Sequence, residues 1–100
     1  MFRLRRSGTV SRGKALEARQ WAKEVTEYVN ENYAPVSAQV YSEIFGDLGK
    51  VHWYIDYEDL ATIEMYSARL LADEGYQVLL SKAADLFVEG SIRDTLIQSL

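Results

Sequence analysis

The chain has 100 residues, so one domain spanning residues 1–100 is expected. A net charge of −4 argues against nonspecific nucleic-acid binding through a global basic field. The absence of cysteine excludes disulfides and thiolate metal sites. No apolar run approaches the ~20 residues needed to span a membrane. The N-terminal arginines are not followed by the apolar stretch of a secretory signal, so a cytoplasmic protein is the default expectation.

Nearly half of the residues are hydrophobic and 12% are aromatic, which fits either a full core or a sizeable subunit interface. The seven tyrosines favour an interface, because each tyrosine combines an apolar ring with a polar tip.

Residues 2–10 alternate between apolar and polar side chains, which predicts a first strand with a bulge or bend at Gly8. A short basic arm is the alternative for this end of the chain. Its basic residues are Arg3, Arg5, Arg6, Arg12 and Lys14.

Small and apolar residues then recur at steps of three and four, which predicts an amphipathic helix over residues 12–33. Ser11 is the expected N-cap. Asn30, Asn32 and Pro35 mark the end of the helix. The apolar stripe consists of Ala15, Ala18, Ala22, Val25 and Val29, widened by Leu16, Trp21 and Tyr28.

A hairpin follows, with a second strand over residues 36–45, a glycine-containing turn at 46–49 and a third strand over 51–57. The third strand, VHWYIDY, has the clearest period of two in the chain. Its odd positions are apolar or aromatic, whereas His52, Tyr54 and Asp56 can all form hydrogen bonds. One face of this strand should therefore pack on a core and the other should be polar.

Glu58 and Asp59 open a second long helix, whose inner stripe is predicted to be Leu60, Ile63, Tyr66 or Ser67, and Leu70. Residues 73–75 break it, a shorter helix covers 76–86, and residues 91–97 form the last strand. The order strand, helix, strand, strand, helix, strand predicts an α+β ferredoxin-like split βαβ fold. Right-handed crossovers then place the helices on one face of a four-stranded antiparallel sheet.

The face left bare in a single chain decides the expected assembly. The helix-covered face should carry Phe2, Leu4, Ala38, Val40, Val51, Trp53 and Ile55. The bare face should carry Arg3, Arg5, Gln39, Tyr41, Glu43, Phe45, His52, Tyr54 and Asp56. Aromatic side chains mixed with charges fit a homodimer interface through this open face, and a solvated sheet face is the alternative.

The topology, the stretch Val51–Leu60 and the run Gly90–Asp94 resemble the dimeric α+β barrel superfamily, in particular its NIPSNAP-like and antibiotic-biosynthesis-monooxygenase-like families. The resemblance implies two sheets packed face to face, with ligands between sheet and helices or inside the barrel. The superfamily contains cofactor-free oxygenases, haem-degrading enzymes, cyclases and many members without known activity, so the resemblance indicates architecture better than function.

His52 is the one candidate catalytic residue, as a general base, because histidine is the side chain whose unperturbed pKa lies near neutrality. Its partner would come from the paired strand, where Tyr41 or Glu43 is well placed. The alternative is a histidine that is hydrogen-bonded in an interface or simply exposed. Arg3, Arg5 and Arg93 could bind an anion, or could pair with Glu43, Asp56 or Asp94 on neighbouring strands.

The expected function is binding or transformation of a small hydrophobic or aromatic molecule between sheet and helices, of the cofactor-free oxygenase or cyclase type. The predicted pocket lining is Tyr41, His52, Tyr54, Trp21 and Tyr66. No cofactor and no metal site is predicted, since one histidine and no cysteine supply few ligands. The alternative function is a non-catalytic dimeric interaction domain, in which Tyr54 and Phe45 would pack a solid barrel interior without a cavity.

Overall fold

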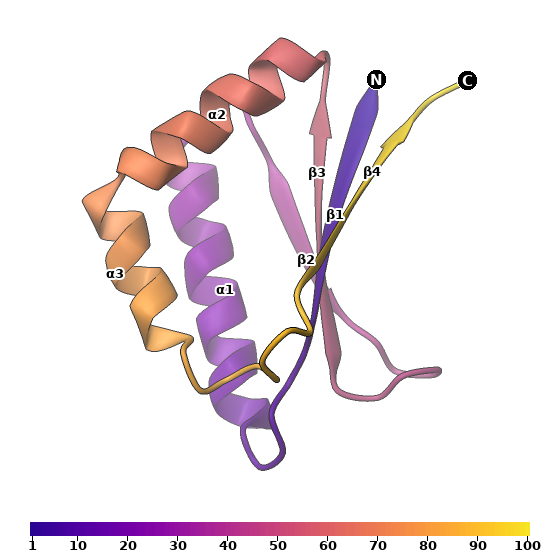
Figure 1. The fold of residues 1–100 in the computed structure, drawn as a ribbon, viewed down its shortest axis with the longest axis vertical. Helices are drawn as coiled ribbons and strands as arrows, with labels where there is room; N and C mark the ends of the chain where they lie inside the picture. Colours follow the sequence, from indigo (N-terminus) through magenta and orange to yellow (C-terminus); the bar gives the residue numbers. More distant parts are fainter.

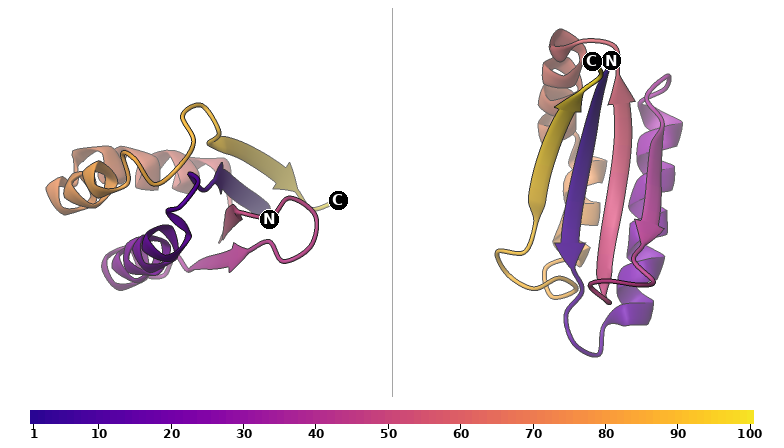
Figure 2. Two further views of the ribbon diagram at one scale, coloured as in Figure 1. Left: turned by 90° about the horizontal axis from the view of Figure 1, so that it is seen from below. Right: turned by 90° about the vertical axis from the view of Figure 1, so that its right-hand side faces the viewer.

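Four antiparallel strands form one sheet in the order β2-β3-β1-β4 in the computed structural model, which describes residues 1–100. The strands are β1 (Phe2–Thr9), β2 (Ala38–Ser42), β3 (Lys50–Tyr57) and β4 (Arg93–Gln98). The helices are α1 (Ala15–Asn32), α2 (Leu60–Ala72) and α3 (Glu74–Lys82). All three helices cover the same face of the sheet, as Figures 1 and 2 show. The predicted ferredoxin-like fold is confirmed, including a short helix before the last strand.

The registers of the strands confirm the predicted division of residues between the two faces. Leu4 pairs with Ile55, and Val40 pairs with Trp53, on the helix-covered side. His52 pairs with Ser7 and with Tyr41 on the open side. The alternation extends to Arg6, which lies opposite Trp53 and so faces the helices.

Helix α1 buries the predicted stripe of small and apolar residues, but it begins three residues later than expected. Lys14 is its N-cap, and Ser11 contributes only its carbonyl, which accepts from the Lys14 amide at 3.0 Å. The predicted cap at Ser11 is therefore wrong. Near the C-terminal end of α1, the Asn30 side-chain amide bonds both the N–H and the C=O of Ala38, at 2.7 and 3.0 Å. These two hydrogen bonds hold the start of β2 beside α1.

Two aspartates set the boundaries of α2 and α3. The Asp59 carboxylate accepts from the Thr62 amide and Asp73 accepts from the Tyr76 amide, and each caps the helix that follows it. The sequence predicted a break at residues 73–75, but α3 already begins at Glu74 and ends at Lys82 rather than at 86. Leu60 was expected on the inner stripe of α2 and is instead exposed, because it occupies the first turn beyond the edge of the core.

The second strand is shorter than predicted, since β2 ends at Ser42 and residues 43–49 form a loop. This loop projects away from the sheet on the side opposite the helices (Figure 1). Phe45, expected on the bare face of a strand, is 90% exposed in the loop. Ile44 and Leu48 are exposed beside it.

Gly8 does not form the predicted bulge, because its pairing with Val51 continues the regular register of β1 and β3. Glycine at this position instead permits a close approach of another segment. A Cβ atom on residue 8 would lie 2.6 Å from Ile92 Cδ1 and 3.1 Å from Phe87 Cδ1. The glycine therefore lets the segment before β4 pass directly over β1.

The core between the layers is incompletely closed. Only 14 of the 100 residues are buried, and none of the large side chains is completely shielded from solvent. The main cluster comprises Val29, Tyr33, Val36, Ala38, Tyr57 and Tyr66. All six of these residues also line an unfilled space between the sheet and the helices. None of the helices combines the length and apolarity needed to cross a bilayer.

Candidate functional site

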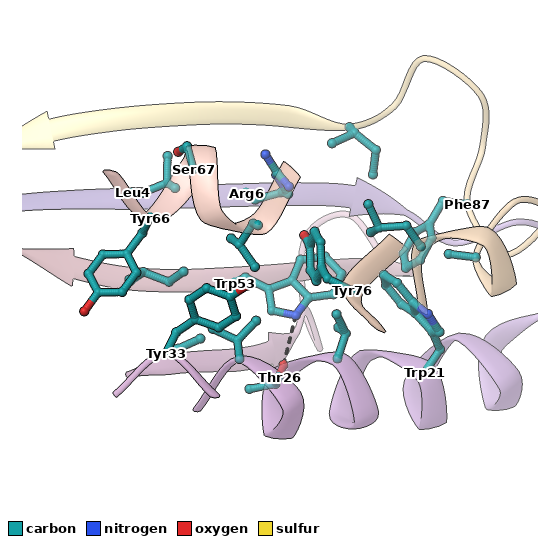
Figure 3. A pocket seen from close by; sticks show the side chains of 18 of the residues that line it. Leu4, Arg6, Trp21, Thr26, Tyr33, Trp53, Tyr66, Ser67, Tyr76 and Phe87 are labelled. Atoms are coloured by element: carbon teal, nitrogen blue, oxygen red, sulfur yellow. Dashed lines mark hydrogen bonds between the residues drawn. The ribbon is translucent and has the colours of Figure 1, made fainter. Parts of the chain in front are cut away.

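A cavity of about 360 Å³ lies between the inner face of the sheet and the helices (Figure 3). Of the 24 residues that line it, 19 are hydrophobic. Protein interiors are normally close-packed, so an apolar space of this size inside a 100-residue chain is the most prominent candidate for a ligand site.

Three aromatic rings pack against one another at one end of the cavity. The ring centroids of Trp21, Trp53 and Phe87 are 5.6 to 6.0 Å apart in edge-to-face or tilted geometry. Both indoles are fixed by hydrogen bonds: Trp53 Nε1 donates to Thr26 Oγ1 at 3.1 Å, and Trp21 Nε1 donates to the Leu79 carbonyl at 2.7 Å. This end of the cavity is therefore a preformed aromatic wall.

Tyrosines line the other end of the cavity. Tyr66 packs against Tyr33 and Tyr57, with ring centroids 6.1 and 6.4 Å away. The Arg69 guanidinium lies over the rings of Tyr33 and Tyr66, at 4.6 and 5.2 Å from their centroids. Burial raises the pKa of the Tyr57 phenol, which accordingly stays protonated and is able to donate a hydrogen bond.

The cavity contains one guanidinium, that of Arg6 from β1. Its Nε and Nη2 donate to the two carboxylate oxygens of Asp94, at 2.7 and 2.8 Å, in a bidentate pair between β1 and β4. The hydrogen bonds with Arg6 hold the pKa of Asp94 below its usual range, and Asp94 in turn raises the pKa of Arg6. Tyr76 from α3 points toward Arg6 across the cavity (Figure 3).

A second constellation lies on the open face of the sheet, on the side opposite the cavity. His52 Nε2 and Glu43 Oε1 are 2.7 Å apart, and Ser7 Oγ lies 2.6 Å from His52 Nδ1. Of the two predicted partners for His52, the structure selects Glu43. The Glu43 carboxylate also accepts a hydrogen bond from the backbone N–H of Asp47. Both bonds lower the pKa of Glu43, and the bond with His52 is the larger cause.

The arginines of the open face divide into paired and unpaired residues. Arg3 forms a bidentate pair with Asp56, at 2.8 and 3.0 Å, as the pairing alternative predicted. Arg5 reaches only Thr95 Oγ1, at 3.5 Å, and Arg93 forms neither an ion pair nor a side-chain hydrogen bond. Asp94 was a predicted partner for these arginines, but it lies on the cavity side with Arg6.

The sheet separates the five residues predicted to line one pocket. Trp21 and Tyr66 do line the cavity. Tyr41, His52 and Tyr54 were expected there too, but they lie on the open face, because even positions of β3 and their β2 partners point away from the helices. Tyr41 and Tyr54 pack edge to face there, with centroids 5.7 Å apart.

Sequence reasoning missed several residues of both sites. The parity of Phe2, Leu4 and Arg6 could have placed Arg6 inside the cavity. Ser7 could have been found only from the register of β1 against β3, which places it opposite His52. No group of three or more His, Cys, Asp or Glu side chains lies close enough together to hold a metal ion.

Comparison with solved structures shows the same fold in proteins of low sequence identity. A NIPSNAP domain protein from Burkholderia xenovorans superposes with a TM-score of 0.83 at 18% identity, covering 100% of this chain and 95% of that one. A NIPSNAP family protein from Agrobacterium tumefaciens gives 0.80 at 14% identity, covering 99% and 85%. A protein from Nitrosomonas europaea described as a candidate antibiotic biosynthesis monooxygenase gives 0.77 at 12% identity, covering 100% and 99%.

These likenesses confirm the resemblance to NIPSNAP-like and antibiotic-biosynthesis-monooxygenase-like proteins at the level of the fold. No curated protein matches the chain significantly. Residues 2–97 match a family defined by sequence, and the chain therefore belongs to the family of unknown function DUF6039.

Proposed function

We propose that this protein binds a small hydrophobic, aromatic molecule in the cavity between its sheet and helices. The observation that carries the proposal is the cavity itself, at about 360 Å³ with 19 hydrophobic residues among its 24. Ligand sites in proteins commonly have volumes of about 300–1,000 Å³, apolar walls and a few polar groups.

The chemistry of the walls supports an aromatic ligand with one polar end. The Trp21, Trp53 and Phe87 rings offer edges and faces for stacking. Burying apolar ligand surface contributes about 25 cal/mol per Å² before the cost of association. Arg6 and Tyr76 supply hydrogen-bond donors on one side of the cavity. Because Asp94 already neutralises Arg6, a neutral oxygen on the ligand suffices as acceptor.

The finer form of the proposal is that the molecule is also transformed, in a cofactor-free reaction of the oxygenase or cyclase type. The fold shared with the Nitrosomonas europaea protein supports this form. Trp21 and Tyr66 are the predicted ligand residues that the proposal retains in the cavity.

We further propose that two copies associate through the open face of the sheet. Tyr41 and Ile97 on that face are 55% and 57% exposed, and the loop 43–49 projects beside it with three exposed apolar side chains. Standard protein interfaces bury about 1,600 Å² in total, or about 800 Å² on each partner. The open face of a four-stranded sheet is a surface of that order. A second copy would shield these side chains with the same surface.

The binding proposal is tested with N-phenyl-1-naphthylamine, a neutral aromatic probe whose fluorescence rises in apolar surroundings. Binding should also quench the intrinsic emission, because both tryptophans line the cavity. Ser67→Phe places a ring at the cavity wall and should weaken binding about tenfold or more, corresponding to ~1.4 kcal/mol. Ala68→Phe is the matched control, since residue 68 is an exposed neighbour on α2 outside the lining.

Equal affinity in the Ser67→Phe and Ala68→Phe variants would contradict the proposed site, because the probe would then be bound elsewhere. Enhanced probe fluorescence without quenching of the tryptophans would do the same. Circular dichroism melting of both variants shows that each remains folded under the conditions of the titration.

A further inference from the structure

We infer that Ser7, His52 and Glu43 form a nucleophilic site for acyl transfer on the open face of the sheet. The site lies across the sheet from the cavity, so it is independent of the ligand proposed above. Its parts come from different strands: Ser7 from β1, His52 from β3, and Glu43 directly after β2. Such an arrangement is recognised by geometry and not by the order of residues in the chain.

The hydrogen bonds define the tautomer of the imidazole. An ionised carboxylate only accepts hydrogen bonds, so Glu43 requires the proton of a neutral His52 ring to sit on Nε2. Nδ1 then carries the lone pair and accepts from the Ser7 hydroxyl, 2.6 Å away. The hydroxyl is thereby aimed at a base that a third group orients, which is the arrangement of an activated nucleophile. The two ring nitrogens have exchanged the positions they hold in chymotrypsin, which leaves the proton relay unchanged.

Arg93 supplies the positive charge that a developing oxyanion needs. It is the direct cross-strand partner of Ser7 on β4 and lies on the same face. Directly opposed residues have Cβ atoms about 5 Å apart, within reach of a group bonded to Ser7 Oγ. Arg93 has no acidic partner, unlike Arg3 and Arg6, whose guanidiniums are occupied by Asp56 and Asp94. Its charge is therefore free for a substrate.

The site is accessible to a small ester. The His52 side chain keeps 15% of its surface exposed, and Ser7 is half-buried. Both lie at the end of the sheet from which the loop 43–49 projects, and in a single chain no helix covers this face. The unpaired Arg5, two residues from Ser7 on the same face, favours a carboxylic ester that carries an acidic group.

The reaction conserves atoms and charge without a further reactant except water. The Ser7 oxygen attacks the ester carbonyl carbon while His52 Nδ1 takes the hydroxyl proton. The carbon–oxygen bond to the alcohol breaks, and the proton leaves His52 with the alcohol. Water then attacks the acyl-serine through the same base, releasing the acid and restoring the Ser7 hydroxyl.

The probe for this site is p-nitrophenyl acetate, followed by release of p-nitrophenolate and by mass spectrometry of the quenched protein. Acetyl-Ser7 is the expected adduct. Ser7→Ala and His52→Gln should lower the initial rate about 100-fold or more. Arg93→Gln should lower it ~100-fold through the lost oxyanion charge. Ser81→Ala, whose hydroxyl bonds only the α3 backbone, is the control and should not change the rate.

Glu43 is a positioning residue, and Glu43→Gln gives a signature that a purely structural role would not. The glutamine amide can donate to Nε2, which favours the opposite tautomer and places a proton on Nδ1. Nitrogen-15 NMR of the single histidine should show the Nε2–H form in the unsubstituted chain and the Nδ1–H form in the variant. The rate should fall together with that change.

Three results would overturn the inference. One is the absence of any acetyl-Ser7 in the unsubstituted chain. Another is a rate that survives Ser7→Ala with acetyl on His52, which would show an ordinary imidazole reaction. The third is an unchanged tautomer in Glu43→Gln. Each can occur while probe binding in the cavity remains intact, so this inference and the proposed function fail separately.

Discussion

The phenol of Tyr33, directly after α1, donates a hydrogen bond of 2.6 Å to Asp73, the residue between α2 and α3. The Tyr28 phenol donates to the same carboxylate at 2.7 Å, and the Tyr76 amide donates at 3.1 Å. The Asp73 carboxylate thus links α1 to the junction between α2 and α3. These donors lower the pKa of Asp73, with the Tyr33 hydroxyl as the largest cause.

Replacing Tyr33 with phenylalanine should lower the free energy of unfolding by about 1–2 kcal/mol. Asp73 loses one hydrogen-bond donor, whereas the phenylalanine ring keeps the packing contacts of the tyrosine ring. Burial, and then the bond to Asp73, raises the pKa of Tyr33 to about 12. The pKa of a tyrosine in the unfolded chain is ~10. The stabilisation linked to the neutral phenol is therefore complete below pH ~10 and is lost as the pH rises toward 12.

Urea unfolding between pH 8 and 12 checks this prediction. The stability difference between the unsubstituted chain and Tyr33→Phe should shrink across that interval. Tyr41→Phe, which alters an exposed ring on the other face, is the control. A difference that stays constant from pH 8 to 12 would show that Tyr33 does not titrate as the structure indicates.

The fold was predictable because the periodicities of α1 and β3 are strong and agree with the turn residues between them. The strict alternation in β3 was sufficient to assign each of its side chains to a face, and the registers bear that out. What failed was local. Ser11 resembles a cap by residue type, but the chain between Thr9 and Ala15 turns through Gly13 at φ +80°, which moves the helix start.

The site was predicted only in part. The alternation of each strand showed which face of the sheet a residue lies on, but it could not show that a cavity remains between that face and the helices. Trp21 on α1 and Tyr66 on α2 line the cavity between sheet and helices, where the sequence placed them. His52 was grouped with them, although its own parity put it on the open face. Phe87 lies in an irregular segment, where no periodicity predicts orientation. An isolated β-bridge to Val10, the residue directly after β1, holds this segment beside the sheet.

A methyl group at residue 8 tests the close passage of the segment before β4. Gly8→Ala should destabilise the chain by no more than about 1 kcal/mol, because the new Cβ overlaps Ile92 Cδ1, the end of a flexible side chain that is 49% exposed and can shift. Ile92→Val removes that atom, so the double variant should recover most of the loss. Chemical denaturation of the four combinations gives the coupling energy, and a strictly additive cycle would show that these two residues do not meet.

The pair of Arg6 and Asp94 should contribute little at neutral pH and less in acid. Both side chains are nearly half exposed, so Arg6→Met should cost only about 0.5–1 kcal/mol. The pKa of Asp94 is lowered in the folded chain, so the stabilisation is present above the unfolded value near ~4 and is lost as the pH falls below it. The difference in the free energy of unfolding between the unsubstituted chain and Arg6→Met should therefore shrink between pH 5 and pH 2. The decrease should approximately equal the difference measured at pH 7. Parallel curves would contradict the assigned pair.

Association through the open face predicts opposite outcomes for the same substitution on the two sides of the molecule. Ile97→Glu would bury an unpaired carboxylate between the sheets, so sedimentation equilibrium should show a dimer for the unsubstituted chain and a monomer for this variant. Val78→Glu, on the exposed surface of α3, should remain dimeric. Because binding a second copy stabilises only the folded chain, the melting temperature should rise with protein concentration except in Ile97→Glu. An unsubstituted chain that sediments as a monomer at micromolar concentration, with a melting temperature independent of concentration, would leave the open face to solvent and remove the homodimer.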